Sequence, residues 1–175
     1  MTYSPPLAHG PANTFLGYVL ATSVEYGDSR FMFTPDVQGP IVEKSLQYIL
    51  LMAPDLLIVG GPPLYLSQFT DHERELAQNS LVLLASTIPI LVVDHHIMRD
   101  KSWNNWMQPI WEKAEEAGNR VLTMAELSGA NNIILEAERE ELYQNDPPTE
   151  EFLTWAQSTE EFKLKHRAPV VGLDE

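Results

Sequence analysis

Four side chains that could bind metal ions stand at three points of the sequence, each beside turn-forming residues. His9 lies in Ser-Pro-Pro-Leu-Ala-His-Gly-Pro, Asp36 in Phe-Thr-Pro-Asp-Val-Gln-Gly-Pro, and His95 and His96 in Leu-Val-Val-Asp-His-His-Ile. Neutral imidazole and ionised carboxylate are the ligands that suit zinc, iron or manganese where no thiolate is present. The chain has no cysteine. The chemistry expected here is therefore metal binding through nitrogen and oxygen atoms.

The residue types alone leave two interpretations of the His pair open. Two adjacent histidines after a strand form either an ordinary hydrogen-bonded loop or part of a metal site. Adjacent residues after a strand point to opposite sides, so the sequence does not separate His95 from His96 as the ligand. We expect His95 to be the ligand, with His96 or Asp94 supporting it by a hydrogen bond from outside the ligand shell.

An alternation of helices and strands positions these residues. Two antiparallel strands, at 16–26 and 30–34, are expected around the turn Gly27-Asp28-Ser29. The further elements expected are helices at 41–52, 71–86, 103–117, 130–143 and from Thr149 onward, and strands at 55–60, 90–93 and 120–123. This order predicts an α/β fold with a mixed sheet and flanking helices. Asp36 and the His pair then follow strands at their C-terminal ends, where such sheets usually hold ligands.

Composition limits the class of protein and its partners. The 175 residues predict a single domain, 1–175, with a helical extension over 146–175. The 25 acidic and 11 basic residues give a net charge of −14, which disfavours nucleic acid as a partner. No apolar run is long enough for a bilayer, so no membrane partner is expected. Without a secretory signal or cysteine, the cytoplasm is the expected location. The expected substrate is a small molecule.

Longer phrases of the sequence resemble a known superfamily. F-T-P-D-V-Q-G-P at 33–40, P-D-L-L-I-V-G-G-P-P-L-Y-L at 54–66 and V-D-H-H-I-M-R-D at 93–100 occur in an order similar to the second half of metallo-β-lactamase superfamily proteins. More narrowly, they resemble uncharacterised archaeal hydrolases of that superfamily. The similarity covers most of residues 4–148. It implies half of an αβ/βα sandwich whose N-terminal half is absent.

The resemblance also implies roles for the four candidate residues. His9 and either His95 or His96 would be metal ligands, and Asp36 would be the bridging ligand and the catalytic carboxylate. The expected cofactor is a divalent metal, foremost zinc, with iron or manganese, or no metal in the isolated chain, as alternatives. Water activated by the metal would attack an ester, a thioester or a phosphodiester. The expected activity is therefore that of a metal-dependent hydrolase.

The sequence departs from the superfamily at one central point. The motif H-x-H-x-D-H, which supplies most metal ligands there, occurs nowhere in the 175 residues. An isolated half would leave an apolar sheet face exposed, so we expect a separately encoded N-terminal half or a homo-oligomer to cover it, unless the chain repacks alone. Two functions remain: an incomplete metallo-hydrolase, or a non-catalytic interaction subunit that keeps the fold and oligomerises.

Overall fold

The computed structural model describes residues 1–12 and 14–169. The chain forms two compact units, Met1–Ala137 and a second that begins at Glu138. The first unit is built on a mixed sheet with flanking helices, as the sequence predicts. The single-domain assignment and the extension at 146–175 stay predictions.

The main sheet has six strands in the order β1-β4-β5-β6-β7-β8. Their bounds are β1 Thr2–Tyr3, β4 Thr22–Tyr26, β5 Ser29–Thr34, β6 Leu56–Gly60, β7 Ile90–Asp94 and β8 Arg120–Leu122. The strands from β5 to β8 run parallel, and β1 and β5 each pair antiparallel with β4. A separate two-stranded sheet joins β2 (Leu7–Ala8) to β3 (Tyr18–Val19). The carboxyl ends of the parallel strands therefore meet at one edge, where the candidate residues were expected.

The predicted hairpin is confirmed, with a shorter first strand. β4 and β5 pair from Thr22 with Phe33 to Tyr26 with Ser29, around a turn at Gly27 and Asp28. Gly27 has φ 59°, which is the left-handed region that favours glycine. The expected strand at 16–26 is divided into β3 and β4.

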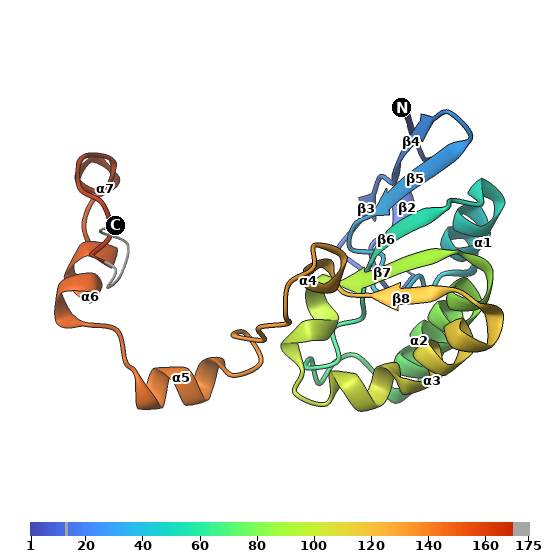
Figure 1. Ribbon diagram of the computed structural model, residues 1–175. Helices are drawn as coiled ribbons and strands as arrows, with labels where there is room; N and C mark the ends of the chain where they lie inside the picture. The colour runs from blue at the N-terminus through green and yellow to red at the C-terminus, as the bar shows by residue number, and fades with distance from the viewer. Residues whose placement is uncertain (13, 170–175) are drawn as a thin grey trace. The chain divides into compact units, whose positions relative to one another are not determined.

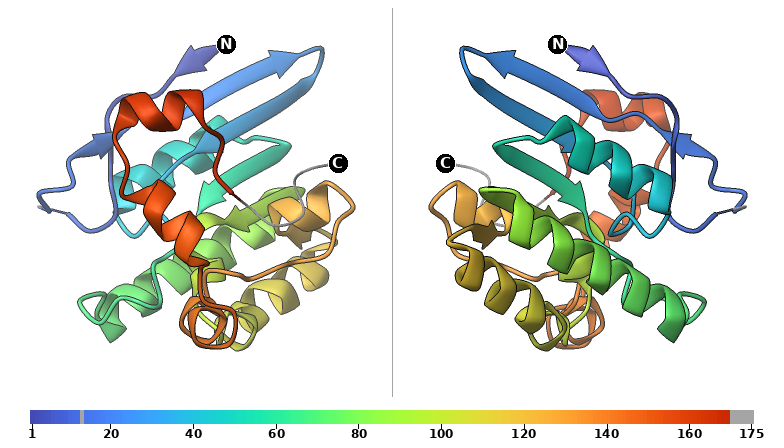
Figure 2. Two further views of the ribbon diagram at one scale, coloured as in Figure 1. Left: turned by 90° about the vertical axis from the view of Figure 1, so that its left-hand side faces the viewer. Right: turned by 90° about the vertical axis from the view of Figure 1, so that its right-hand side faces the viewer.

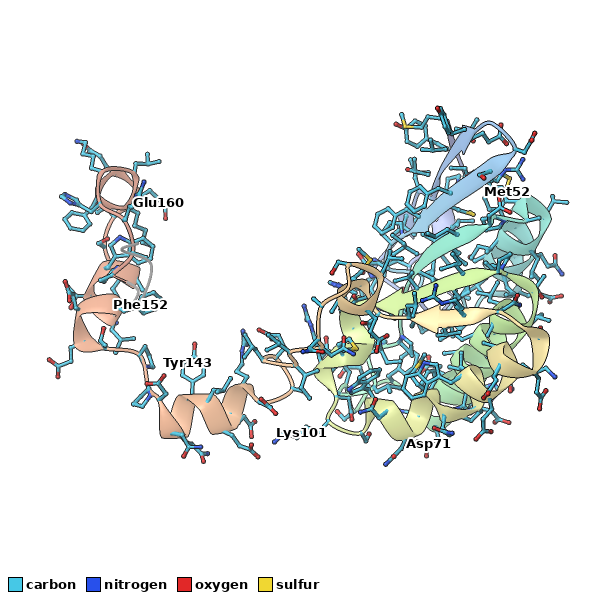
Figure 3. The ribbon with its side chains drawn as sticks, viewed as in Figure 1. Met52, Asp71, Lys101, Tyr143, Phe152 and Glu160 are labelled. Carbon is cyan, nitrogen blue, oxygen red and sulfur yellow. The ribbon has the colours of Figure 1, made fainter. Side chains whose placement is uncertain are left out.

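Three helices of the first unit cover one face of the sheet. They are α1 (Glu43–Met52), α2 (Asp71–Thr87) and α3 (Trp103–Ala117), all close to their predicted bounds. Figure 1 shows them gathered on one side of the strands, and the right-hand view of Figure 2 shows them in front of the sheet. The buried side chains that fill this layer include Met32, Ile49, Leu57, Leu81, Leu84, Leu91 and Ile110. Figure 3 shows side chains occupying the space between sheet and helices.

The opposite face of the sheet is apolar and partly open. Cross-strand pairing places Val24 beside Phe31, and Phe33 beside Ile58, on this face. Val24 is 37% exposed and Phe33 is 41% exposed. A short helix, α4 (Met124–Leu127), packs against β7 and β8. The face therefore combines an apolar surface with solvent access.

The prediction of a helix over 130–143 is wrong for residues 130–138. The chain instead forms α4, then Gly129 with φ 77°, and resumes helical structure only at α5 (Arg139–Asn145). The Asn132 side chain contacts the capping box of α4, at 2.6 Å from Thr123 Oγ1 and 3.1 Å from the Glu126 carboxylate. Side-chain bonds of this kind compete with helix propagation. Local capping therefore overrides the helical periodicity.

The last helix, predicted as one segment from Thr149, is two short helices. Thr149 caps α6 (Glu150–Ala156) by accepting a hydrogen bond from the Phe152 amide at 3.1 Å, as expected. Thr159 caps a second helix, α7 (Glu160–Lys165), in the same way. Because Thr159 is a strong N-cap, it starts a new helix instead of extending the first.

Candidate metal centre

Three neighbouring strands position the candidate centre. Asp36 lies two residues beyond β5, and the Gly60-Gly61 pair ends β6. His95 and His96 follow β7 directly, in the short 3-10 helix η1 (His95–Arg99). Because β5, β6 and β7 are parallel and adjacent, these segments converge at one edge of the sheet.

Asp36, His95 and His96 come together in space. The Nε2 atoms of His95 and His96 lie 3.4 and 3.7 Å from Asp36 Oδ1. One ligand atom from each of the three residues lies within 4.8 Å of the others. The two imidazole rings meet edge to face, with centroids 4.2 Å apart. A nitrogen, nitrogen and oxygen donor set of this size could enclose a divalent metal ion.

His9 lies close to this trio and outside it. Among the described residues, the group whose ligand atoms converge does not include His9. The His9 charge makes the smallest contribution to the lowered pKa of His96. The following residue, Gly10, packs so tightly on Gln38 that an added Cβ would lie 2.2 Å from Gln38 Oε1. His9 is therefore held beside the loop that carries Asp36.

The backbone of the candidate centre is strained at two of the candidate ligands and at Gln38. Asp36 has φ 46°, Gln38 φ 55° and His95 φ 69°, all in the left-handed region that non-glycine residues rarely adopt. Such conformations cost about 1–3 kcal/mol each and collect at binding and catalytic sites. Gly60 permits the Asp36 turn to approach, because an added Cβ would lie 2.7 Å from the Asp36 nitrogen. The convergence of the trio thus depends on unusual backbone geometry.

His96 is the most shielded of the trio. Its side chain is 17% exposed, against 51% for His95. Burial lowers the pKa of His96 to about 4, with further lowering by His95, Arg99 and His9 and an opposing effect of Asp36. At neutral pH the His96 ring is therefore uncharged, which is the form that binds metals.

A phenol and a guanidinium stand behind His96. The Tyr65 hydroxyl lies 3.0 Å from His96 Nδ1, and Arg99 Nη1 donates a hydrogen bond to the same hydroxyl at 3.3 Å. The sequence reasoning gave Tyr65 no role. Its place after the strand-ending Gly-Gly-Pro-Pro could have pointed to this edge of the sheet, because β6 ends there as well.

Asp94 supports the centre through the backbone. Its Oδ1 accepts a hydrogen bond from the His95 amide at 2.6 Å, and its Oδ2 accepts one from the Met124 amide at 2.8 Å. Both oxygens therefore bind the first residues of helical segments, η1 and α4. This carboxylate holds the backbone of His95 and of Met124, and a supporting role toward a metal ligand stays a prediction.

A cavity of about 380 Å³ adjoins the trio. Its polar lining comes from Asp36, Asp94 and His95, and its apolar lining includes Phe33, Ile58 and Met124. Phe33 and Ile58 belong to the open face of the sheet, so the cavity continues from that face to the candidate ligands. A cavity of this size and mixed lining could admit a small molecule.

Among the residues that the structure describes, no helix is long and apolar enough to cross a bilayer.

Comparison with known proteins finds archaeal relatives. The chain is 39% identical over 145 residues to a UPF0282 protein of Pyrobaculum islandicum, an alignment that covers 82% of this chain and 46% of the relative. It is 37% identical over 144 residues to a UPF0282 protein of Methanopyrus kandleri, covering 81% and 48%. A UPF0282 protein of Korarchaeum cryptofilum is 31% identical over 150 residues, covering 85% and 50%. The chain thus spans about half the length of the curated relatives it matches.

These comparisons correct the expected superfamily. The relatives are named UPF0282 proteins, and none of these names refers to a metallo-β-lactamase. No family model matches the chain, and no solved structure matches it. The assignment to the metallo-β-lactamase superfamily was therefore wrong; it rested on three phrases of 8 to 13 residues at strand ends and turns. Over most of its own length, the chain is similar to the UPF0282 proteins of archaea.

Proposed function

We propose that this chain provides a divalent-metal site for a hydrolase that acts on an ester, a thioester or a phosphodiester. The convergence of Asp36, His95 and His96 at the carboxyl ends of the parallel strands β5 and β7 carries the proposal. Catalytic metal sites commonly have three protein ligands and leave a position for water. The proposed ligands match that number, and the adjoining cavity offers room for a substrate.

The donor atoms fit zinc, and also iron or manganese. Both His residues present Nε2 toward the same carboxylate oxygen, so the carboxylate of Asp36 stands between two nitrogen donors. A bound metal supplies Lewis acidity, which lowers the pKa of a bound water and makes hydroxide available near neutral pH. Asp36 would balance the metal charge and orient that water.

Backbone strain supports a functional role for the trio. Two of its three members, Asp36 and His95, have positive φ values. Aspartate and histidine adopt positive φ more readily than most non-glycine residues, but glycine would reduce the conformational cost further. Strained residues of this kind collect at binding and catalytic sites, which supports a role for these two side chains.

A second proposal concerns partners. The sheet face that includes Val24 and Phe33 is apolar and partly exposed, and the curated relatives are about twice as long as this chain. A second copy of the chain or a further polypeptide half would cover such a face and could complete the ligand shell. A subunit that only associates through this face, without catalysis, is the alternative function. The cytoplasm is the location proposed for either form.

Metal analysis of the purified chain tests the proposed site. We expect stoichiometric Zn²⁺ binding in titration calorimetry, and a loss of affinity of at least about 100-fold in Asp36→Ala, because loss of even a supporting partner costs about 10–100-fold. His72→Ala is the matched control, since His72 is an exposed residue in the first turn of α2. It should bind Zn²⁺ like the wild type.

Two outcomes would contradict the hydrolase proposal. One is a wild-type chain that binds no Zn²⁺, Fe²⁺ or Mn²⁺; the other is an Asp36→Ala variant with unchanged affinity. A metal-free chain that sediments as a stable oligomer would favour the interaction subunit. Substitution of Phe33 by Asp, which places a charge on the open face, should then dissociate that oligomer.

A further inference from the structure

We infer that Tyr65, braced by Arg99, is a positioning residue that sets the orientation of the His96 ring and can pair with either of its tautomers. The inference rests on the proposed metal site and adds the group that prepares one of its ligands. The Gly-Gly-Pro-Pro segment at 60–63 would then serve to lead the chain from β6 to Tyr65.

The contact to His96 occupies one ring nitrogen and directs the other. The Tyr65 hydroxyl lies 3.0 Å from Nδ1, and the two ring planes are tilted by 38° with centroids 6.1 Å apart. Nε2 then faces Asp36 Oδ1 at 3.7 Å. Histidine ligands usually have their second nitrogen bound to a hydrogen-bonding partner, which fixes ring orientation and tautomer. Tyr65 occupies that place for His96.

Arg99 contacts Tyr65 at two places, the hydroxyl and the face of the ring. Its Nη1 donates to the hydroxyl oxygen at 3.3 Å, and its guanidinium carbon lies 5.9 Å from the centroid of the tyrosine ring. A guanidinium can only donate hydrogen bonds. One acceptor position of the phenol oxygen is therefore taken by Arg99, and the contact with His96 Nδ1 must use either the phenol hydrogen or the second acceptor position.

These two possibilities correspond to two tautomers of His96. Without metal, the carboxylate of Asp36 near Nε2 favours a proton on Nε2, and the Tyr65 hydroxyl then donates to Nδ1. If Nε2 held a metal, that nitrogen would have to be unprotonated, and the proton on Nδ1 would be donated to the Tyr65 oxygen. The phenol suits both tautomers because it can donate or accept a hydrogen bond.

The loop that carries Tyr65 is fixed on both sides. Arg74 of α2 donates from Nη2 to the carbonyl oxygens of Leu64 at 2.9 Å and Leu66 at 3.3 Å. The Leu64 side chain is buried, with 6% exposure, while Tyr65 itself is 38% exposed. The tyrosine is thus anchored by its neighbours and not by burial of its own ring. Its hydroxyl is the part that contacts the candidate centre.

The test compares Tyr65→Phe with the matched control Tyr26→Phe. Tyr26 is 89% exposed at the end of the hairpin. We expect Tyr65→Phe to weaken Zn²⁺ affinity by about 10-fold and to shift the visible absorption bands of the Co²⁺-loaded chain, since one ligand loses its fixed orientation. Arg99→Lys should weaken Zn²⁺ affinity by less than Tyr65→Phe does. The double variant Tyr65→Phe/Arg99→Lys should bind Zn²⁺ as tightly as Tyr65→Phe alone, because Arg99 acts through the tyrosine. Tyr26→Phe should match the wild type in both measurements.

Nitrogen-15 NMR of the imidazoles supplies a signature that a merely structural residue would not produce. Addition of Zn²⁺ to the wild type should move the His96 proton from Nε2 to Nδ1. Unchanged Zn²⁺ affinity and Co²⁺ spectrum in Tyr65→Phe, beside a loss of Zn²⁺ in Asp36→Ala, would overturn this inference and leave the metal site standing. A wild-type chain that binds no metal would overturn both.

Discussion

The two ends of the parallel strands β5, β6 and β7 differ in how their polar groups are used. At the amino end, the Arg30 guanidinium donates to the Glu25 carboxylate at 2.5 and 2.9 Å and to the Met52 carbonyl at the end of α1. Asp55 accepts from the Arg30 amide at 2.7 Å. At the carboxyl end, two imidazoles and one carboxylate face one another without bonds of comparable length. The polar groups of the amino end are satisfied within the fold, and the carboxyl end is where we propose the metal ligands.

Backbone geometry shows the same contrast. The amino end has one non-glycine residue with positive φ, Ala53, which forms the left-handed cap of α1 that helices commonly have. The carboxyl end has Asp36, Gln38 and His95. Positive φ at a helix cap is ordinary, whereas three such residues around converging side chains indicate a site whose geometry costs stability.

Gly60→Ala should have the largest effect on stability. Its Cβ would lie 2.7 Å from the Asp36 nitrogen and 3.2 Å from the Asp36 Cα, so the turn must move. We expect a loss of about 2 kcal/mol in the free energy of unfolding and a Zn²⁺ affinity lowered by about 10-fold. Urea unfolding and titration calorimetry measure the two.

Gly27→Ala is the control that separates the effect of backbone strain from the effect of a close contact with Asp36. Gly27 also resists substitution, because its φ is 59°, but nothing lies within 4 Å of an added Cβ. It should lose about 1 kcal/mol with unchanged Zn²⁺ affinity. Equal Zn²⁺ affinities in the two variants would argue against a role for Gly60 in placing Asp36.

Arg30→Ala should show that the amino end serves stability alone. The guanidinium is 33% exposed and its Glu25 partner 61%, so solvent screening limits the ion pair. We expect a loss of about 1 kcal/mol in the free energy of unfolding, mostly from the hydrogen bonds. Zn²⁺ affinity should equal that of the wild type. A weakened affinity would break the division between the two ends.

His95→Gly should have the smallest effect on stability, and it should raise the free energy of unfolding where the other variants lower it. Glycine removes the strain of φ 69°, worth about 1–2 kcal/mol, and loses part of that gain to chain entropy. We expect the free energy of unfolding of the metal-free chain to rise by about 0.5 kcal/mol, while Zn²⁺ binding is lost. His95→Asn, which tolerates positive φ, is the control for strain with a polar side chain. A destabilised His95→Gly would mean that His95 supports the fold itself.

The order of helices and strands was predictable because it depends on local patterns. The apolar run Leu56–Gly60 ends in Gly-Gly-Pro-Pro, and Thr70 with Glu73 forms the capping box that begins α2. The segment 130–138 was not predictable in this way. Asn132 binds Thr123 and Glu126, and such contacts between loop and cap leave no periodic signal.

The candidate site also has residues that could be predicted from the sequence and residues that could not. Asp36 and the His pair could be singled out because they follow strands and are suited to metals. The place of Tyr65 behind His96 could not, because a contact across 31 residues of sequence depends on how the loop after β6 meets the turn after β7. His9 was expected as a ligand and stays a prediction, since it lies near the trio without joining it.

By itself, the sequence determined the element types and the presence of nitrogen and oxygen donors at the strand ends, because hydrophobic periodicity, turn residues and the lack of cysteine are local properties. The tertiary structure decided which donors meet. Parallel pairing of β5, β6 and β7 brings Asp36 to within 3.4 Å of His95 and 3.7 Å of His96. That proximity depends on strand register and on the close approach at Gly60, and both are set only when distant segments pack together.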